Sequence, residues 1–578
     1  MTATPIQFTA QDDDRSAVAA SLDALARDRF VERLWARDPA LWASDPGGQD
    51  AVRNGLGWLR APAAMAETVE DLRRFAAEAR DAGYRHVLHM GMGGSSLAPL
   101  VFARTFPEAP GLHLTVLDTT DPATILAEDR RAQGARTLFI VASKSGTTAE
   151  PLAFGEYFYT KQRAAAGDRA GEAFIAITDA GTPLAKQAEE RRYRRVFANA
   201  ADVGGRYSAL TYFGLVPAAL AGVDVGGLLR RALVMADACG PSVAPPRNPG
   251  VHLGAVMGEL ARRGRDKITF VVSDPLVALG TWLEQLLAES TGKHGTGLLP
   301  VADEPLGDPA VYGADRVFVH IRLRGAGNGE AAGRLEALGN AGHPVVGLEL
   351  DDTLDLAPEF LRWEIATAAA GAILGINAFD QPNVQESKDN TNRLLDVVRR
   401  EGRLPEPAPS QRAGALGLYA DRPERDAAAT LARFLEERRP GGYVGILAYL
   451  PEAPETHRRL QKIRVRLRDA ARLATTLGYG PRYLHSTGQY HKGGPSNGLF
   501  LLITGDDAAD APVPGEPYTF GVFKRAQALG DLEALRRHGQ RALRVHLGGA
   551  VDAALAQLDD LTAAAITAGS RGRPRRRE

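Results

Sequence analysis

The chain has 578 residues, a formal net charge of −1, 44% hydrophobic residues and 24% charged residues. This composition is ordinary for a globular enzyme, and the balanced charge argues against a nucleic-acid-binding protein, which needs a basic field. The length predicts about three or four domains at roughly 100–200 residues each. The one cysteine, Cys239, excludes an internal disulfide and a cysteine-based zinc site, and it fits a reducing compartment.

The two ends of the sequence carry no targeting pattern. The start, MTATPIQFTAQDDDR, is polar and acidic, without the basic and apolar regions of a secretory signal peptide. The most apolar helical run, IATAAAGAILGI from Ile365, is too short and too rich in alanine to span a membrane. We therefore expect a cytoplasmic protein. The basic end at 570–578 is predicted to be a disordered, solvated tail, with nucleic-acid or membrane contact as the minor alternative.

Residues 15–80 are predicted to be helices that pack around a first sheet. From residue 86 onward, short apolar segments alternate with helical patterns, which is typical of parallel sheets with helices on both faces. Gly- and Pro-rich sequence separates a first set of strands from a second, and the linker LPEPAPSQR precedes a third. The predicted strands are 86–90, 114–118, 137–142, 174–179 and 195–199; then 267–274, 316–323 and 344–350; then 443–450, 498–504, 518–523 and 542–548.

Two turns rich in glycine and serine follow predicted strands and indicate an anion site. They are GMGGSS at 91–96 and SKSGTT at 143–148. The second offers four hydroxyls and a lysine before a predicted helix, whose free N–H groups and positive dipole end favour an oxyanion. The alternative is a helix cap with spare hydroxyls, although a cap needs only one such residue and no lysine. Neither turn has the P-loop spacing, and GMGGSS lacks the last glycine of the dinucleotide-binding GxGxxG pattern.

Both turns resemble those of sugar-isomerase domains, which bind phosphosugars, and three further segments are similar to phosphoglucose isomerases. GGRYS at 204–208 matches the family pattern GGRxS, and QLLAESTGK at 285–293 matches QxxxESxGK. FDQP at 379–382, with Val384 and Lys388, matches FDQxxVxxxK. The resemblance implies reversible isomerisation of glucose 6-phosphate and fructose 6-phosphate in glycolysis and gluconeogenesis, by a homodimer without cofactor. No metal is implied either, since the sequence has no HExxH motif or cluster with ligand spacing.

The resemblance also implies a role for each matched residue. Residues of the SKSGTT turn would bind the phosphate, and residues of GMGGSS and GGRYS would lie against the sugar. The implied substrate- and phosphate-binding residues are Gly94, Ser95, Ser143, Lys144, Ser145, Thr148, Gly205, Gln285 and Gln381. Glu289 would be the base, Arg206 would sit at the reacting carbons, and Lys388 would assist ring opening.

Elementary chemistry supports the two central assignments. Isomerising an aldose to a ketose moves a proton between neighbouring carbons, which one carboxylate can do if its pKa is lifted by an apolar pocket. Glu289 lies four residues after Gln285, so a helix places both on one face, and the flanking Leu286 and Leu287 can supply the pocket. Arg206 suits the charge of an enediolate because a guanidinium stays charged and can bond two oxygens. The alternatives are a solvated helix glutamate and a surface arginine in a turn.

The ring-opening histidine of the family is displaced here. It normally follows the ESxGK segment, and in many bacterial members it lies in a segment like LHSxGQ. After Lys293 this chain reads HGTGLLPVADEP, and LHSTGQ occurs instead at 484–489. The layout resembles the isomerase portion of transaldolase–phosphoglucose isomerase fusions. We predict that His485 opens the ring, with His294 as the rival, and a histidine supplied within the chain makes a monomer the alternative to the homodimer.

The predicted fold class is α/β, with doubly wound parallel sheets in two sugar-isomerase-type subdomains plus a C-terminal α/β unit. The predicted parts are an N-terminal helical segment (1–85), a first sugar-isomerase subdomain that binds phosphate (86–238), a second with the catalytic Glu and Lys (239–403), a C-terminal α/β unit with the displaced LHSTGQ segment (404–569) and the basic tail (570–578).

Three other functions make distinct demands on the sequence. A dual phosphoglucose/phosphomannose isomerase would use the same base with a roomier pocket. A phosphosugar-binding regulator would carry a helix-turn-helix segment near its start, but the helices before residue 86 are acidic and show no basic recognition face. An amidotransferase would need a nucleophilic cysteine near its start, where the sequence reads MTA.

Overall fold

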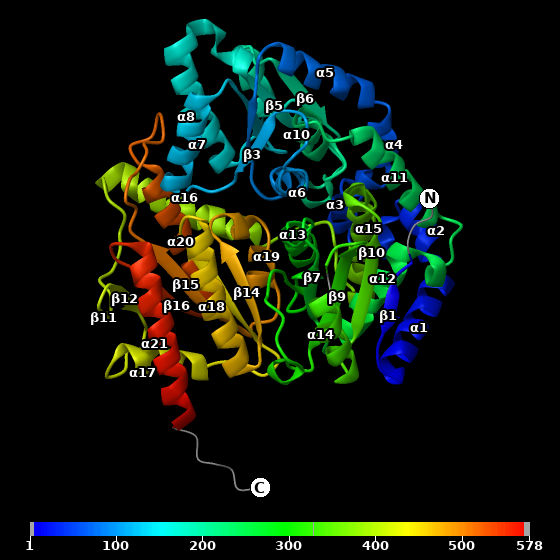
Figure 1. Ribbon diagram of the computed structural model, residues 1–578, viewed down its shortest axis with the longest axis vertical. Helices are drawn as coiled ribbons and strands as arrows, with labels where there is room; N and C mark the ends of the chain where they lie inside the picture. The colour runs from blue at the N-terminus through cyan, green and yellow to red at the C-terminus, as the bar shows by residue number, and fades with distance from the viewer. Residues whose placement is uncertain (1–4, 328, 572–578) are drawn as a thin grey trace. The chain divides into compact units, whose positions relative to one another are not determined.

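The computed structural model describes residues 5–327 and 329–571 (Figure 1). Its contacts group them into two compact units. The first is drawn from Met1–Asp118, Ala127–Asp303 and Val317–Gln381, and the second from Thr119–Leu126, Glu304–Arg316 and Pro382–Glu578. The subdomain boundaries expected from the sequence stay a prediction.

The N-terminal region is helical, as predicted. Its helices are α1 (Asp12–Arg27), α2 (Phe30–Trp35), α3 (Pro46–Arg53), α4 (Ala61–Ala66) and α5 (Val69–Asp81). In α5 the buried residues recur at helical spacing, at Leu72, Phe75, Ala76 and Ala79, and this face packs against α10 (Tyr212–Ala221) beside the first sheet. A short strand, β1 (Gln7–Thr9), precedes the helices and was not predicted.

The first sheet has the order β3-β2-β4-β5-β6 and all its pairings are parallel. Its strands are β2 (His86–Met90), β3 (His113–Leu117), β4 (Thr137–Ala142), β5 (Phe174–Asp179) and β6 (Arg195–Asn199), which confirms the predicted set. Its other helices are α6 (Leu97–Thr105), α7 (Pro122–Gly134), α8 (Ala149–Ala166) and α9 (Pro183–Glu190). The chain runs from β2 outward to β3 and then returns to β4 on the other side. The GMGGSS and SKSGTT turns therefore leave the carboxyl ends of the two strands at this switch point, where open α/β sheets bind ligands.

The second sheet has the order β1-β10-β9-β7-β8. It holds β7 (Lys267–Val272), β8 (Leu299–Val301), β9 (Arg316–Leu323) and β10 (Val345–Leu350), with β1 added antiparallel to β10. The accompanying helices are α11 (Val225–Ala238), α12 (Pro249–Arg262), α13 (Leu279–Thr291), α14 (Gly329–Asn340) and α15 (Leu356–Leu374). Helices α12 and α15 pack against each other along glycines and alanines: a Cβ on Gly254 would lie 2.5 Å from the Ala366 carbonyl oxygen.

The third sheet, in the second unit, has the order β11-β12-β16-β15-β13-β14. Its strands are β11 (Gln411–Ala413), β12 (Leu416–Tyr419), β13 (Tyr443–Tyr449), β14 (Ala474–Tyr479), β15 (Gly498–Gly505) and β16 (Arg541–Leu547), and β11 and β12 pair antiparallel. Its helices are α16 (Val384–Glu401), α17 (Ala427–Glu436), α18 (Pro454–Ala471), α19 (Gly488–Gly493), α20 (Phe520–Arg537) and α21 (Val551–Arg571). The expected doubly wound parallel sheets are thus present with antiparallel edge strands added.

Two sequence predictions in the C-terminal region need correction. The segment 518–523, predicted as a strand, opens helix α20 instead, because the Thr519 hydroxyl oxygen accepts from the Val522 N–H and caps it. Phe520 and Phe523, three residues apart, then face the interior together. At the chain end, α21 continues to Arg571, so the first two residues of the predicted tail are helical, and 572–578 lie outside the described residues. In the part of the chain that the structure describes, every helix is too short or too polar to cross a membrane.

Candidate active site

The backbone of the GMGGSS turn packs directly against the backbone of the GGRYS segment. A Cβ on Gly94 would lie 2.1 Å from the carbonyl carbon and oxygen of Gly205, so only glycine fits there. The Ser208 hydroxyl donates to the Gly94 carbonyl oxygen over 3.3 Å. The turn predicted to line the sugar pocket is therefore docked directly on the GGRYS segment, and this places Arg206 beside it.

Buried histidines on β2 hold this turn and its strand. His89 contacts the Ser95 carbonyl oxygen through Nε2 at 2.6 Å, and burial lowers the pKa of His89 to about 4. The ring is therefore neutral near pH 7, and since Nε2 faces a carbonyl it carries the proton and donates. His86 lies between the hydroxyls of Thr137 and Thr115, and burial lowers its pKa to about 4 as well. Both are strand histidines, as the sequence indicated.

In the SKSGTT turn, hydroxyls gather in front of α8. The Ser143 hydroxyl donates to Thr148 Oγ1 over 3.0 Å, and the hydroxyls of Ser145 and Thr147 are 2.8 Å apart. Gly146 takes a left-handed φ of 67°. The predicted helix after the turn is present as α8, which begins at Ala149, and the Thr148 side chain makes no capping hydrogen bond. The hydroxyls are therefore not used as a helix cap, which removes the main support of the alternative interpretation.

Lys144 is held at this turn by its own partners. Its ammonium group is paired with the Asp179 carboxylate at the end of β5 and donates to the Ala201 carbonyl oxygen over 3.0 Å. Burial raises the pKa of Asp179. The lysine is thus fixed at the carboxyl edge of the first sheet, within a turn that offers donors to an anion.

Arg206 is buried, with 4% of its surface exposed, and each of its N–H groups has an acceptor. Nε donates to the Ser290 hydroxyl over 2.7 Å, and Nη1 donates to Glu289 Oε1 over 3.2 Å. The other three bonds run to residues 378–381: Gln381 Oε1 at 2.9 Å and the carbonyl oxygens of Ala378 at 2.8 Å and Asp380 at 2.9 Å. Arg206 is therefore not a surface arginine in a turn, and it links α13 to the FDQP segment.

Glu289 lies on the same face of α13 as Gln285, as its spacing predicted. Gln285 Nε2 donates to Glu289 Oε2 over 2.9 Å, while the other carboxylate oxygen faces Arg206. Only 9% of Glu289 is exposed, and the neighbouring Leu286 and Leu287 are fully buried. The interpretation as a solvated helix glutamate is thereby contradicted. The carboxylate is oriented by an amide on one side and a guanidinium on the other.

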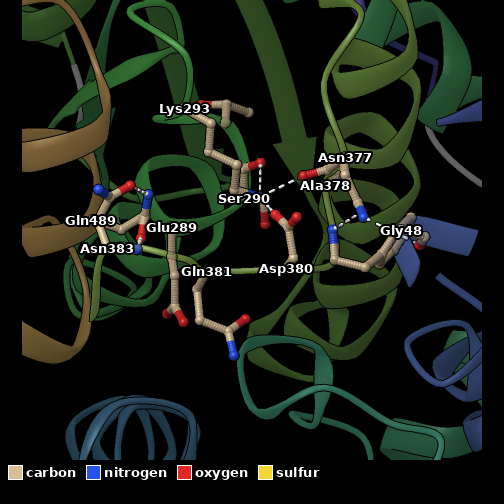
Figure 2. A network of polar contacts seen from close by, with 12 residues as sticks. Gly48, Glu289, Ser290, Lys293, Asn377, Ala378, Asp380, Gln381, Asn383 and Gln489 are labelled. Carbon is tan, nitrogen blue, oxygen red and sulfur yellow. Dashed lines mark hydrogen bonds and ion pairs between the residues drawn. The ribbon is translucent and has the colours of Figure 1, made fainter. Parts of the chain in front are cut away.

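Lys293 is a residue of this site that the sequence analysis did not assign, although it stands in the matched QxxxESxGK segment. Its ammonium group is 1% exposed, forms an ion pair with Asp380 Oδ1 at 2.8 Å, and donates to the carbonyl oxygens of Ser290, at 3.0 Å, and Asn377 (Figure 2). Burial, with a contribution from the Arg206 charge, lowers the pKa of Lys293 to about 7. The lysine therefore fastens the end of α13 to the segment that carries Gln381.

The shifted pKa of Lys293 predicts a pH-dependent stability. The unfolded lysine, with a pKa of 10.5, binds more protons than the folded one between about pH 7 and 10.5, so the free energy of unfolding rises with pH there. In Lys293→Met this contribution is absent, so the stability difference, wild type minus variant, is expected to rise by up to about 1.4 kcal/mol per pH unit in that window. Urea unfolding at several pH values measures it. A pH-independent difference would contradict the shift.

The remaining predicted residues are distributed over the two units. The first unit brings together Gly94, Gly205, Arg206, Gln285, Glu289 and Gln381, and it also holds Ser95 and the SKSGTT turn at the edge of its first sheet. The second unit holds Lys388, exposed on α16, and His485, half-buried at the end of the 3₁₀ helix η9 (Arg482–His485). Elements α16 and η9 pack against each other. The rival His294 is exposed in the first unit, in a turn with a φ of 54°.

Comparisons with known proteins show which proteins this chain is similar to. The phosphoglucose isomerase family model matches residues 63–298, a span that includes the GMGGSS, SKSGTT, GGRYS and QLLAESTGK segments. A glucose-6-phosphate isomerase of Rubrobacter xylanophilus is 31% identical over 383 residues, which are 57% of this chain and 87% of that protein. One from Thermus thermophilus is 30% identical over 382 residues, covering 59% and 90%.

Solved structures show the same fold. A hypothetical protein from Thermus thermophilus has a TM-score of 0.58 at 25% identity, covering 68% of this chain and 99% of that one. A glucose-6-phosphate isomerase from Chlamydia trachomatis has a TM-score of 0.50 at 21% identity, covering 64% and 78%, a likeness of fold. Since the bacterial relatives are matched over 87% and 90% of their length, the chain belongs to the glucose-6-phosphate isomerase family.

Proposed function

We propose that the chain interconverts glucose 6-phosphate and fructose 6-phosphate and that Glu289 moves the proton between C2 and C1. One observation supports this assignment above the others: the buried Glu289 carboxylate lies between the Gln285 amide and the Arg206 guanidinium. A fixed base beside a fixed cation is what proton abstraction next to a carbonyl requires, because negative charge develops on the substrate oxygens.

The proposed reaction has two chemical stages. In the first, the cyclic sugar phosphate opens to its carbonyl form, with His485 and Lys388 moving the protons. In the second, Glu289 takes the C2 proton, which leaves an enediolate whose charge Arg206 stabilises. The hydroxyl proton then passes from O2 to O1, and the Glu289 carboxyl group returns its proton at C1. Each stage conserves protons and electrons and uses side chains alone. The SKSGTT turn binds the phosphate through its hydroxyls and the N–H groups at the start of α8.

A direct assay tests this activity. Supplied with fructose 6-phosphate, the full chain is expected to form glucose 6-phosphate, which a coupled dehydrogenase detects, and to reach the same equilibrium from either side. A chain that converts neither sugar phosphate at micromolar enzyme would contradict the proposal. Whether it acts as a homodimer or as a monomer stays a prediction.

The two histidine candidates make opposite predictions for ring opening. We expect His485→Ala to slow the interconversion of the glucose 6-phosphate anomers by roughly 10²-fold, the low end of what a positioned proton-transfer group contributes. His294→Ala is the matched control and is expected to leave that rate unchanged, because the His294 side chain is exposed. Anomer exchange followed by nuclear magnetic resonance gives the rate. A slower rate in His294→Ala with an unchanged rate in His485→Ala would show that His485 does not open the ring. An equal loss of His485→Ala activity on ring-closed and on freshly opened substrate would show the same.

A further inference from the structure

Two separate links join the start of helix α16 to the LHSTGQ segment and to the residues that flank it within the second unit. The first is a pair of hydrogen bonds between Asn383 and Gln489 (Figure 2). The Asn383 N–H donates to Gln489 Oε1 over 2.9 Å, and Gln489 Nε2 donates to Asn383 Oδ1 over 2.8 Å. Asn383 precedes the first residue of α16, and Gln489 is the last residue of LHSTGQ and is fully buried. The end of the segment is thus fixed to the start of the helix.

The second link passes through one carboxylate, Asp531 on α20. Oδ2 accepts from the Tyr483 hydroxyl at 2.7 Å, and Oδ1 accepts from Ser387 Oγ at 3.2 Å and from Lys492 Nζ at 2.7 Å. Asp531 and Lys492 are both fully buried, and burial beside Asp531 raises the pKa of Tyr483, so its hydroxyl keeps the proton that it donates. Three segments, η9, α16 and α19, therefore meet at a single acidic group.

These links flank the two residues proposed to open the sugar ring. His485 lies between Tyr483, which bonds Asp531, and Gln489, which bonds Asn383. Lys388 directly follows Ser387, so the helix position that carries the exposed lysine is anchored by its buried neighbour. The two links run through the neighbours of His485 and Lys388, so they fix the backbone at both residues without using either side chain.

Helix α20 itself is fixed along the same face. Lys524 Nζ donates to Asp121 Oδ2 over 2.8 Å, and the hydroxyl of Thr120 donates to Gln527 Oε1 over 2.7 Å. Lys524, Gln527 and Asp531 follow one another at spacings of three and four, so they form one stripe on the helix. Asp531 therefore lies on a helix that is held by further buried contacts, and these contacts help to fix the position of the groups bonded to Asp531.

We propose that Asp531 is a positioning residue for ring opening, which sets the spacing between His485 and Lys388 through Tyr483 and Ser387. This inference rests on the proposed function. A buried ion pair is a poor way to gain stability, because desolvating both charges offsets their attraction and an apolar pair would serve as well. A carboxylate, however, can accept several directional bonds at once, so it can hold several segments in register.

The test uses variants that leave no unpaired charge: Ser387→Ala removes the bond to Asp531, and Tyr483→Phe removes a hydroxyl that bonds both Asp531 and Tyr449. Tyr483→Phe and Ser387→Ala, made in the full chain, are expected to slow anomer interconversion of glucose 6-phosphate by roughly tenfold each, as loss of one bond to a charged group predicts. The KM for fructose 6-phosphate is expected to stay within about twofold, since neither residue is placed at the substrate. The anomer interconversion rate and the KM are measured on the same samples, and circular dichroism gives the folded fraction.

A matched control separates positioning from stability. Asp559, on α21, is also a buried carboxylate between two cations, Lys462 at 2.6 Å and Arg466 at 3.0 Å. Asp559→Asn is expected to lower the unfolding temperature and to leave anomer interconversion per folded molecule unchanged. If Tyr483→Phe and Ser387→Ala also kept the wild-type rate per folded molecule, the positioning role would be overturned. A wild-type chain without isomerase activity would instead overturn the proposed function, so the two failures are distinguishable.

Discussion

Glu289→Gln is expected to lower kcat/KM for fructose 6-phosphate by on the order of 10²–10⁴-fold, the contribution of a positioned general base. The substitution is nearly isosteric, so the hydrogen bond from Gln285 and the packing against Leu286 are kept while the basic oxygen is lost. Substrate binding is then expected to change little, and the loss to fall on kcat. The coupled assay from fructose 6-phosphate measures both parameters.

An exposed glutamate of the same unit gives the matched control. Glu336→Gln, on α14, makes the same chemical change on the surface and is expected to keep wild-type kcat and KM. Wild-type activity in Glu289→Gln would show that Glu289 is not the base. A loss that appeared only as a raised KM would mean that Glu289 binds substrate and that another group moves the proton.

Arg206→Lys is expected to lower kcat by about 10²–10³-fold, the range seen when one preorganised donor to a developing oxyanion is removed. The lysine keeps the positive charge beside Glu289 but cannot reproduce the fork of N–H groups that now reaches Ser290, Gln381 and two backbone carbonyls. The variant is also expected to be less stable, because buried carbonyl oxygens lose their donors.

A second buried arginine distinguishes the loss of rate from the loss of stability. Arg316 pairs with Glu304 at 3.1 Å, both fully buried, in the second unit and outside the candidate site. Arg316→Lys is expected to lower the unfolding temperature while leaving kcat per folded molecule near the wild-type value. Equal losses of kcat in Arg206→Lys and Arg316→Lys would show that Arg206 acts only through stability.

The fold was largely predictable from the sequence because strands buried on both faces read as uninterrupted apolar runs. HVLHM, TLFIVA and FIAITD all formed strands with the expected ends. The short antiparallel edge strands, such as Gln7–Thr9 and Gln411–Ala413, were not predicted. A strand of three residues with one exposed face is too short to show a clear alternation of apolar and polar residues. The strand prediction for 518–523 was wrong because Tyr518, Phe520 and Val522 alternate as in a strand, while the Thr519 cap that decides the outcome is a single residue.

For the site, the motifs located the residues but not the contacts that orient them. Spacing alone predicted that Gln285 and Glu289 share one face of a helix, and in the structure their side chains are bonded there. The contact of Arg206 with Gln381, by contrast, joins residues 175 apart in the chain, and only tertiary packing creates it. Lys293 was missed for the same reason, since a lysine beside a glycine reads as solvated until burial and Asp380 are known.

Exchange of the C2 proton of glucose 6-phosphate with deuterium oxide, measured beside anomer interconversion in one Glu289→Gln sample, tests the central claim most directly. If Glu289 is the base and the ring is opened by other groups, the variant will interconvert the anomers at close to the wild-type rate and lose C2 exchange by at least about 10²-fold. Exchange of the C2 proton at the wild-type rate in this variant would contradict the assignment of Glu289 as the residue that moves the proton.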